Sequence, residues 1–218
     1  RVIVTRPTVA EINLTAIRKN LKKIKSLSRD SLIYPVVKAN AYGHGYKKVV
    51  KEIENLVDGL CVATTEEALQ IRKITNKNIL CMEGPYDQKE FDLLIKNKID
   101  IVFHAKRQIG FIERTNGFPK EIRVWIKIDT GMNRLGFKED EIIDTFKKLQ
   151  VKTKKIVLMS HFSSAAGTKS SKIKSKKQID SFNKIEKKLN KMGFNPLSSL
   201  CNSGGLLNYR SSHTDIVR

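Results

Sequence analysis

The sequence predicts an α/β fold, and more specifically a (β/α)8 TIM-type barrel of parallel strands. Two observations support this prediction: short apolar runs alternate with helical patterns from one end of the chain to the other, and there are eight such runs. Apolar runs of this kind, joined by helices, are typical of parallel strands that are buried on both faces. An open, doubly wound sheet shares the same alternation, so the pattern leaves that arrangement open.

The apolar runs give the expected strands. They are 32–37, 59–62, 79–82, 99–103, 122–128, 156–159, 197–201 and 214–217. A further stretch at 8–12 could form a ninth strand, either outside the barrel or in a companion domain.

Helical patterns fill the segments between these runs. Apolar residues recur at three- and four-residue steps through 14–27, which predicts an amphipathic helix. Two later helices have recognisable starts, because Thr64 with Glu67 and Asp87 with Glu90 have the spacing of a capping box.

The formal net charge of +20 predicts a lysine-rich surface. The densest lysine run, 169–191, is an amphipathic helix pattern in which the lysines occupy the solvated face. Its apolar face consists of Ile179, Phe182, Ile185, Leu189 and Met192. Aromatic residues do not interleave with the lysines, and no nucleic-acid-binding motif is present, so we expect no nucleic-acid partner.

Composition also bounds the compartment and the site chemistry. There is no run of 18 apolar residues, and 1–11 lacks the features of a secretory signal, so we expect no membrane partner and a cytoplasmic location. Cys61, Cys81 and Cys201 lie far apart in apolar runs, which predicts buried, reduced thiols. The four histidines lack metal-ligand spacing, and we expect no metal site.

In a barrel of this type, chemistry takes place at the C-terminal ends of the strands. Lys38 directly follows the first strand, where partial desolvation favours the neutral, nucleophilic amine. Such a lysine can hold a carbonyl cofactor as a Schiff base, although a surface lysine fits the end of a strand equally well. Gly43 and Gly45 follow it and permit close approach of the backbone to a ligand.

A second polar cluster follows the seventh strand. Asn202, Ser203 and Gly204 lead into a helix pattern, where free N–H groups and the serine hydroxyl can cradle a phosphate. An ordinary N-cap serine is the alternative. A cofactor that carries both an aldehyde and a phosphate would use Lys38 and Ser203 together, and pyridoxal 5'-phosphate is such a cofactor.

The remaining candidates follow other strands on the same face: Tyr42, Lys127, Arg134, His161 and Arg218. Each has a purely structural alternative. His161 could be a core histidine bonded to backbone, Tyr42 could simply pack, and Lys127 could be exposed at an edge. Arg134 could form an ion pair with Asp129 or Glu139.

The segment 36–45, VVKANAYGHG, resembles the cofactor-attachment motif of bacterial alanine racemases. Further segments keep the order of that family: 127–137 (KIDTGMNRLGF), 159–165 (MSHFSSA), Asn202-Ser203 and Val217-Arg218. The resemblance implies that 1–218 is a pyridoxal-phosphate-binding barrel domain and that a C-terminal β domain is missing from the chain. Residues 1–12 would then include a strand that belongs with the missing domain.

The resemblance also implies roles for individual residues. Lys38 would attach the cofactor and act as the base on the D-face hydrogen of the substrate. Tyr42, Ser203 and the backbone of Gly204 would hold the phosphate, with Asn202 beside them. His161 would lie against the pyridine ring.

Three basic residues complete the set that the resemblance implies. Arg134 would contact the phenolic oxygen of the cofactor and orient the substrate. Lys127 occupies a position that is often carbamylated in this family, where the carbamate steadies that arginine. Arg218 would donate to the pyridine nitrogen and, because arginine keeps its own proton, would leave that nitrogen unprotonated.

The implied activity is that of an isomerase: interconversion of L- and D-alanine for peptidoglycan precursors by a homodimer. The second acid/base would be a tyrosine from the C-terminal domain of the partner subunit, so this chain alone should racemise poorly or not at all. A non-catalytic pyridoxal-phosphate-binding barrel and a racemase of broader specificity are the alternatives.

Two positions depart from the usual pattern of the family. Ala166 stands where an acidic residue is often found, and Gly204-Gly205 replaces the usual alanine pair. Each glycine is expected to weaken the helix start by about 1 kcal/mol.

Overall fold

The computed structural model describes residues 8–28 and 30–218, and the fold confirms the predicted parallel barrel. Every predicted strand is present within the described residues. The strands are β1 (Leu32–Ile33), β2 (Gly59–Val62), β3 (Asn78–Cys81), β4 (Asp100–Phe103), β5 (Val124–Lys127), β6 (Ile156–Met159), β7 (Leu197–Ser199) and β8 (Ile216–Val217).

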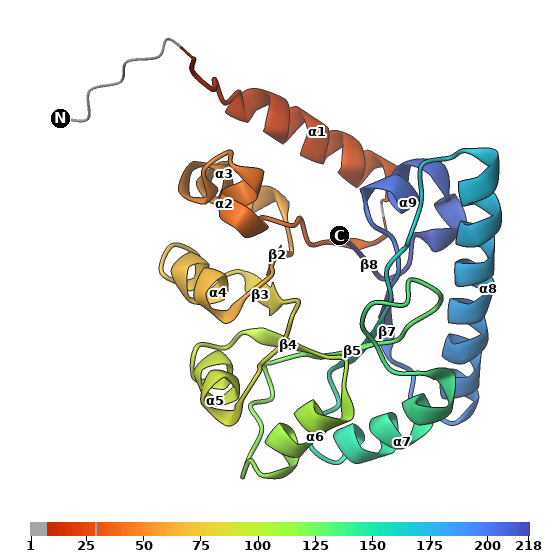
Figure 1. Cartoon of the computed structure of the whole chain (residues 1–218). Coiled ribbons are helices and arrows are strands. Elements are labelled where there is room, and N and C mark those ends of the chain that lie inside the picture. Colours follow the sequence, from red (N-terminus) through yellow and green to blue (C-terminus); the bar gives the residue numbers. More distant parts are fainter. Residues whose placement is uncertain (1–7, 29) are drawn as a thin grey trace.

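Helices connect these strands and lie on the outside of the ring (Figure 1). They are α1 (Leu14–Leu27), α2 (Lys38–Tyr42), α3 (Tyr46–Ile53), α4 (Thr65–Arg72), α5 (Gln88–Lys96), α6 (Lys106–Glu113), α7 (Glu139–Gln150), α8 (Lys169–Lys191) and α9 (Ser203–Asn208), with short 3-10 turns at Glu54–Leu56 and Arg210–Ser212. Helix α1 contacts both α3 and α9 and so bridges an early and a late helix of the ring (Figure 1).

Backbone hydrogen bonds join all neighbouring strands of the ring except β7 and β8. Strands β2 to β7 pair in chain order, and β1 pairs with β8, all in parallel. The segment after β1 joins β2, because the N–H of Val37 donates to the carbonyl of Cys61 (2.8 Å) and the N–H of Cys61 donates to that of Pro35 (2.9 Å). Pairing of the first strand with the last excludes the open sheet.

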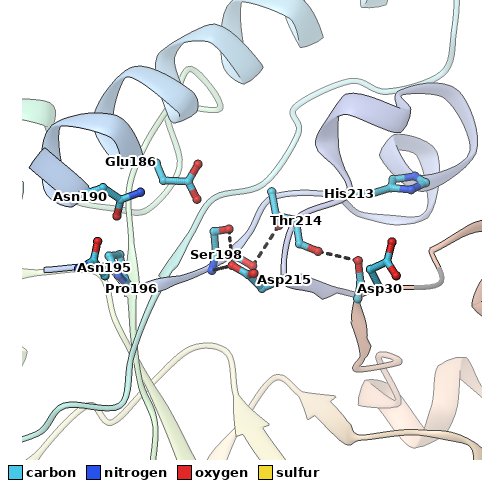
Figure 2. Close-up of a pocket in the computed structure, with 10 residues that line it drawn as sticks. Asp30, Glu186, Asn190, Asn195, Pro196, Ser198, His213, Thr214 and Asp215 are labelled. Carbon is cyan, nitrogen blue, oxygen red and sulfur yellow. Dashed lines mark hydrogen bonds between the residues drawn. The ribbon is translucent and has the colours of Figure 1, made fainter.

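Side chains join β7 to β8 at the remaining seam (Figure 2). The carboxylate of Asp215 accepts from both the N–H and the hydroxyl of Ser198, each at 2.8 Å. The hydroxyl of Thr214 donates to the carbonyl of Ser198 (3.0 Å), and Ser31 donates to the carbonyl of Thr214 (2.6 Å). These polar contacts tie β7, β8 and the start of β1 together.

Alternation along the strands separates two apolar layers. One layer contains both helix and strand residues and lies between the helices and the sheet. The other consists of residues on or beside the strands and fills the interior of the barrel: Tyr34, Cys61, Leu80, Val102, Trp125, Val157, Met159 and Ile216. The interior is therefore a packed apolar core, and polar residues follow it at the C-terminal ends of the strands.

The ninth strand considered at 8–12 is not formed in the structure. Residues 8–12 are neither helix nor strand, and residues 1–7 lie outside the described residues. A strand requires a neighbour for its hydrogen bonds, and residues 8–12 pair with none of the described strands.

The lysine-rich helix α8 has the predicted faces. Ile179, Phe182, Ile185 and Leu189 are buried, and the lysines of the helix are exposed. Met192 was expected on the apolar face but is 46% exposed, because the helix ends at Lys191 and Met192 serves as its C-cap. No helix in the described part of the chain is long and apolar enough to cross a bilayer.

Both predicted helix caps are formed, but in the second the glutamate carboxylate accepts from a different backbone N–H than expected. Thr64 and Glu67 make a complete capping box at the start of α4. Asp87 accepts from the N–H of Glu90 at 2.9 Å, but the carboxylate of Glu90 accepts from the N–H of Tyr86 instead of that of Asp87. The three cysteines are buried and free, as predicted.

A buried carboxyl lies at the opposite end of the barrel from the predicted site. Asp100, the first residue of β4, is 2% exposed and accepts from the N–H of Arg123 (2.8 Å) and the indole N–H of Trp125 (3.4 Å). Burial raises its pKa from 3.8 to about 6, although the Arg123 backbone bond and charge oppose this shift. The folded state therefore favours the protonated form of the Asp100 carboxyl.

Replacing Asp100 with Asn should remove a specific pH dependence of stability. The contribution from Asp100 is fully present below about pH 3.8 and is lost as the pH rises through about 6. At about 1.4 kcal/mol per pKa unit, the free energy of unfolding of the wild type should fall by about 3 kcal/mol relative to Asp100→Asn over this range. Urea denaturation at several pH values measures this difference. Asp92→Asn, at an exposed position, is the control, and parallel pH profiles for the wild type and Asp100→Asn would contradict the assignment.

Candidate active site

A cavity of about 950 Å³ opens at the C-terminal ends of the strands. Gly43 and Gly45, which were expected to let the backbone approach a ligand, do not line this cavity. The lining does include nine other residues predicted from the sequence: Lys38, Tyr42, Lys127, Arg134, His161, Asn202, Ser203, Gly204 and Arg218. These residues come from segments throughout the chain, and the closed ring of strands brings them to one place.

Strand alternation explains why three of these side chains enter the cavity. Each lies two residues after an apolar residue that fills the barrel interior, and residues two apart on a strand face the same side. The pairs are Trp125 with Lys127, Met159 with His161, and Ile216 with Arg218. Lys127 is 7% exposed, so it is not the exposed edge residue considered as its alternative.

Arg218 is fixed at the top of the barrel interior. Its Nε donates to the hydroxyl of Ser199 (2.8 Å), and a terminal nitrogen donates to the carbonyl of Ser160. Burial lowers the pKa of its guanidinium, which nevertheless remains protonated at neutral pH. The side chain thus presents a fixed cation to the cavity.

The cavity carries a large excess of positive charge. Its cations are Lys38, Arg107, Lys127, Arg134 and Arg218. Its single carboxylate, Glu83, accepts from the hydroxyl of Tyr86 (2.9 Å). None of the five cations takes part in an ion pair formed by residues 8–28 and 30–218. Such a site favours an anionic ligand.

Burial and the neighbouring positive charges lower the pKa values of two residues in the cavity. Burial lowers the pKa of Lys127 to about 8, with further lowering by the charges of Arg134 and Arg218. Burial likewise lowers the pKa of His161 to about 3, and Arg218 adds to this effect. His161 is therefore a neutral imidazole at physiological pH, able to lie against an aromatic ring without adding charge.

The structural alternatives for Arg134 and His161 are not observed. Asp129 accepts the N–H groups of residues 131–133, and Glu139 pairs with Lys184, so neither carboxylate holds Arg134. The ring of His161 makes no hydrogen bond within the described residues.

Gln178 is a supporting residue that the sequence reasoning missed. Its side-chain oxygen accepts from the N–H (3.0 Å) and hydroxyl (3.1 Å) of Ser163, and its nitrogen donates to Thr130 (3.3 Å) and to the carbonyl of His161 (3.0 Å). The buried amide thereby joins the loops after β5 and β6, and all four of its hydrogen-bonding positions are used. Its signal in the sequence is an amide on the apolar face of α8, beside Ile179.

The start of α9 offers donors to an anion. Asn202 is the N-cap and accepts from the N–H of Gly205 (2.9 Å), whereas the first-turn N–H groups of Ser203 and Gly204 have no helical carbonyl partner. The Tyr42 side chain is largely exposed, but partial desolvation raises the pKa of its hydroxyl, which stays protonated and can donate. An amine, a neutral imidazole and these donors fit a ligand with a carbonyl, an aromatic ring and a phosphate.

Comparison with known proteins agrees with this arrangement. Residues 12–218 match the family model described as the alanine racemase N-terminal domain. This chain belongs to the alanine racemase family. The alanine racemase of Haemophilus influenzae is 38% identical over 218 residues, and that of Mannheimia succiniciproducens is 37% identical over 216. Each alignment covers 98% of this chain but 58% of the relative, so the chain spans less than two thirds of their length.

Solved structures of alanine racemases share the fold. The biosynthetic alanine racemase from Pseudomonas aeruginosa superposes with a TM-score of 0.88 at 30% identity, covering 98% of this chain and 58% of that one. The enzyme from Acinetobacter baumannii gives a TM-score of 0.85 at 32% identity, covering 95% and 57%.

Packing explains the glycine pair that departs from the usual alanine racemase sequence. A Cβ on Gly205 would lie 2.6 Å from the ring of Phe162 and 2.9 Å from the Cβ of Cys201. A Cβ on Gly204 would lie 2.9 Å from the carbonyl oxygen of Ala165. The glycines thus allow α9 to approach the loop after β6, in addition to weakening the helix start.

Restoring alanine at position 205 should therefore destabilise this chain. Gly205→Ala gains up to about 1 kcal/mol in helix propensity, but overpacking against Phe162 should cost more, for a net loss of about 2 kcal/mol. Chemical denaturation measures the loss. The cost of Gly205→Ala should shrink in a Phe162→Leu background, and equal costs in both backgrounds would show that the ring is not responsible.

Proposed function

We propose that this chain is the cofactor-binding barrel domain of an alanine racemase that uses pyridoxal 5'-phosphate. The complete protein would interconvert L- and D-alanine for peptidoglycan precursors. The convergence of these nine residues on one cationic cavity carries this proposal, and membership of the alanine racemase family supports it.

The donor set suits each part of the cofactor. Lys38 would hold the aldehyde carbon, and His161, as a neutral ring, would lie against the pyridine. Ser203, Tyr42 and the backbone of Gly204 would hold the phosphate, with Asn202 fixing the helix start. Arg218, anchored by Ser199 and Ser160, would donate to the pyridine nitrogen and leave that nitrogen unprotonated.

Proton transfer then follows from the position of the lysine. When bound, pyridoxal phosphate withdraws electrons from the α-carbon of the substrate and makes its hydrogen acidic. The Nζ atom of Lys38 would take or return that proton on one face of the α-carbon. Arg134 would orient the substrate and contact the phenolic oxygen of the cofactor.

Racemisation needs a second acid/base on the opposite face. We assign it to a tyrosine from the C-terminal domain of a partner subunit, which makes the working enzyme a homodimer. The described barrel supplies the Lys38 face, so this chain by itself should bind the cofactor and racemise poorly or not at all. The enzyme would work in the cytoplasm.

Cofactor attachment tests the proposal directly. Purified protein would be mixed with pyridoxal phosphate, reduced with borohydride and digested, and the modified peptide would be mapped by mass spectrometry. The adduct should lie on Lys38 and vanish in Lys38→Ala, whereas Lys48→Ala, at an exposed position, should behave like the wild type. The complete protein should convert L-alanine to D-alanine. Failure to attach the cofactor at Lys38 in the folded, complete protein would end the proposal.

Lys127 should carry a carbamate. Its amine, with a pKa near 8, would attack carbon dioxide, forming an N–C bond and releasing one amine proton to solvent. The anion would offset part of the charge of Arg134 and Arg218. A carbamate signal from ¹³C-bicarbonate should be seen by NMR, grow as the pH rises towards 8, and disappear in Lys127→Ala. Lys154→Ala, an exposed lysine, should retain the signal, and a signal that survives Lys127→Ala would assign the carbamate elsewhere.

A further inference from the structure

Glu67 connects two parts of the chain that are 28 residues apart. One carboxylate oxygen accepts from the N–H of Ala63 (2.8 Å), in the connection between β2 and α4. The other oxygen accepts from the N–H of Ala39 (2.6 Å), the residue directly after Lys38. The capping residue of α4 therefore also reaches the peptide that follows the proposed attachment lysine.

The segment that Glu67 reaches has an unusual backbone. The four residues after Lys38 all have positive φ, between 49° and 55°: Ala39, Asn40, Ala41 and Tyr42. This left-handed conformation crowds the Cβ atom of an L-residue, and consecutive residues rarely adopt it. Such a turn persists only where its surroundings determine it.

Ala41 packs into the core, but few hydrogen bonds from outside reach this turn. The N–H of Ala41 donates to Val37 (3.0 Å) and that of Gly43 donates to Ala39 (3.0 Å), so these bonds stay within the segment. The side chain of Asn40 accepts from the N–H of Tyr46, the first residue of the helix that follows directly along the chain. The bond from Ala39 to Glu67 is the one that ties the first residue of the turn to another element.

We propose that Glu67 is a positioning residue that holds this left-handed turn and thereby aims both Lys38 and Tyr42 into the cavity. The two side chains lie at the two ends of α2, and both line the cavity. Glu67 does not line the cavity itself and acts through the backbone of Ala39. This inference rests on the proposed function, because it assigns Lys38 to the aldehyde and Tyr42 to the phosphate.

A carboxylate suits this role better than an amide. Each of its two oxygens accepts from a different segment, and bonds to an ionised acceptor are stronger than neutral ones. Glutamine at this position would turn a donor towards one of the two N–H groups. Glu67→Gln should therefore keep one of the two connections, and Glu67→Ala should lose both.

The test measures cofactor binding to the complete protein. Glu67→Ala should raise the dissociation constant for pyridoxal phosphate about tenfold, the loss of one charge-assisted hydrogen bond, and Glu67→Gln should lie between it and the wild type. Borohydride trapping followed by peptide mapping should also show a smaller fraction of the adduct on Lys38. Both readouts are independent of racemisation.

Two control variants separate positioning from helix capping. Thr64→Ala removes the other half of the capping box, in which Thr64 accepts from the N–H of Glu67 at 3.4 Å, and leaves Ala39 untouched. Glu66→Ala changes the exposed neighbour. Both should bind the cofactor like the wild type, even where Thr64→Ala lowers the melting temperature as much as Glu67→Ala does.

The outcomes distinguish the two proposals. If Glu67→Ala and Glu67→Gln bind pyridoxal phosphate like the wild type, or if Thr64→Ala weakens binding as much as Glu67→Ala does, Glu67 acts as a cap alone and the inference is overturned. If the wild type itself does not attach the cofactor at Lys38, the proposed function fails first. Glu67→Gln, nearly identical in shape, provides the comparison should Glu67→Ala not fold.

Discussion

Alternation of side chains along the strands of a closed ring is the constraint on which the site depends. The residues that fill the barrel interior and those that line the cavity belong to the same inward-facing series. Trp125 leads to Lys127, and Ile216 leads to Arg218, with one outward residue between them. Because the ring is closed, inward residues from strands far apart in sequence meet, so a change of one residue in register would turn these cations towards the helices.

The same geometry gives the site its electrostatic character. Lys127 is buried above the apolar interior, and burial, together with the neighbouring cations, lowers the pKa values of Lys127 and His161. Holding these charges close together opposes folding of the empty barrel. An anionic ligand that binds only the folded state offsets that repulsion, so cofactor binding and stability are linked in this fold. The empty barrel is therefore less stable than the barrel with an anionic ligand bound.

Periodicity in the sequence was enough to predict the strands and the cluster of site residues, since both follow from the order of apolar and polar positions. It was not enough for contacts between distant segments. Gln178 reaches Thr130 across 48 residues, and Asp215 closes the seam by binding Ser198. The place of Gln178 on the apolar face of α8 indicates that its amide is buried, but nothing local names the partner of either residue. The prediction for Met192 was wrong for a related reason. The periodic pattern placed Met192 on the apolar face of α8, but the helix ends one residue earlier, at Lys191.

The rim of the cavity exposes apolar and aromatic side chains that a covering domain could bury. Four large, apolar or aromatic side chains that line the cavity are exposed: Tyr42, Tyr86, Leu135 and Leu207. Proton transfer at an α-carbon proceeds best where water is excluded, and an open rim does not exclude it. A covering surface that buries these side chains would shield Lys38 and could present a second acid/base across from it. The racemase proposal requires both effects from one element, the C-terminal domain of a partner subunit, and the exposed rim is the surface on which that domain would act.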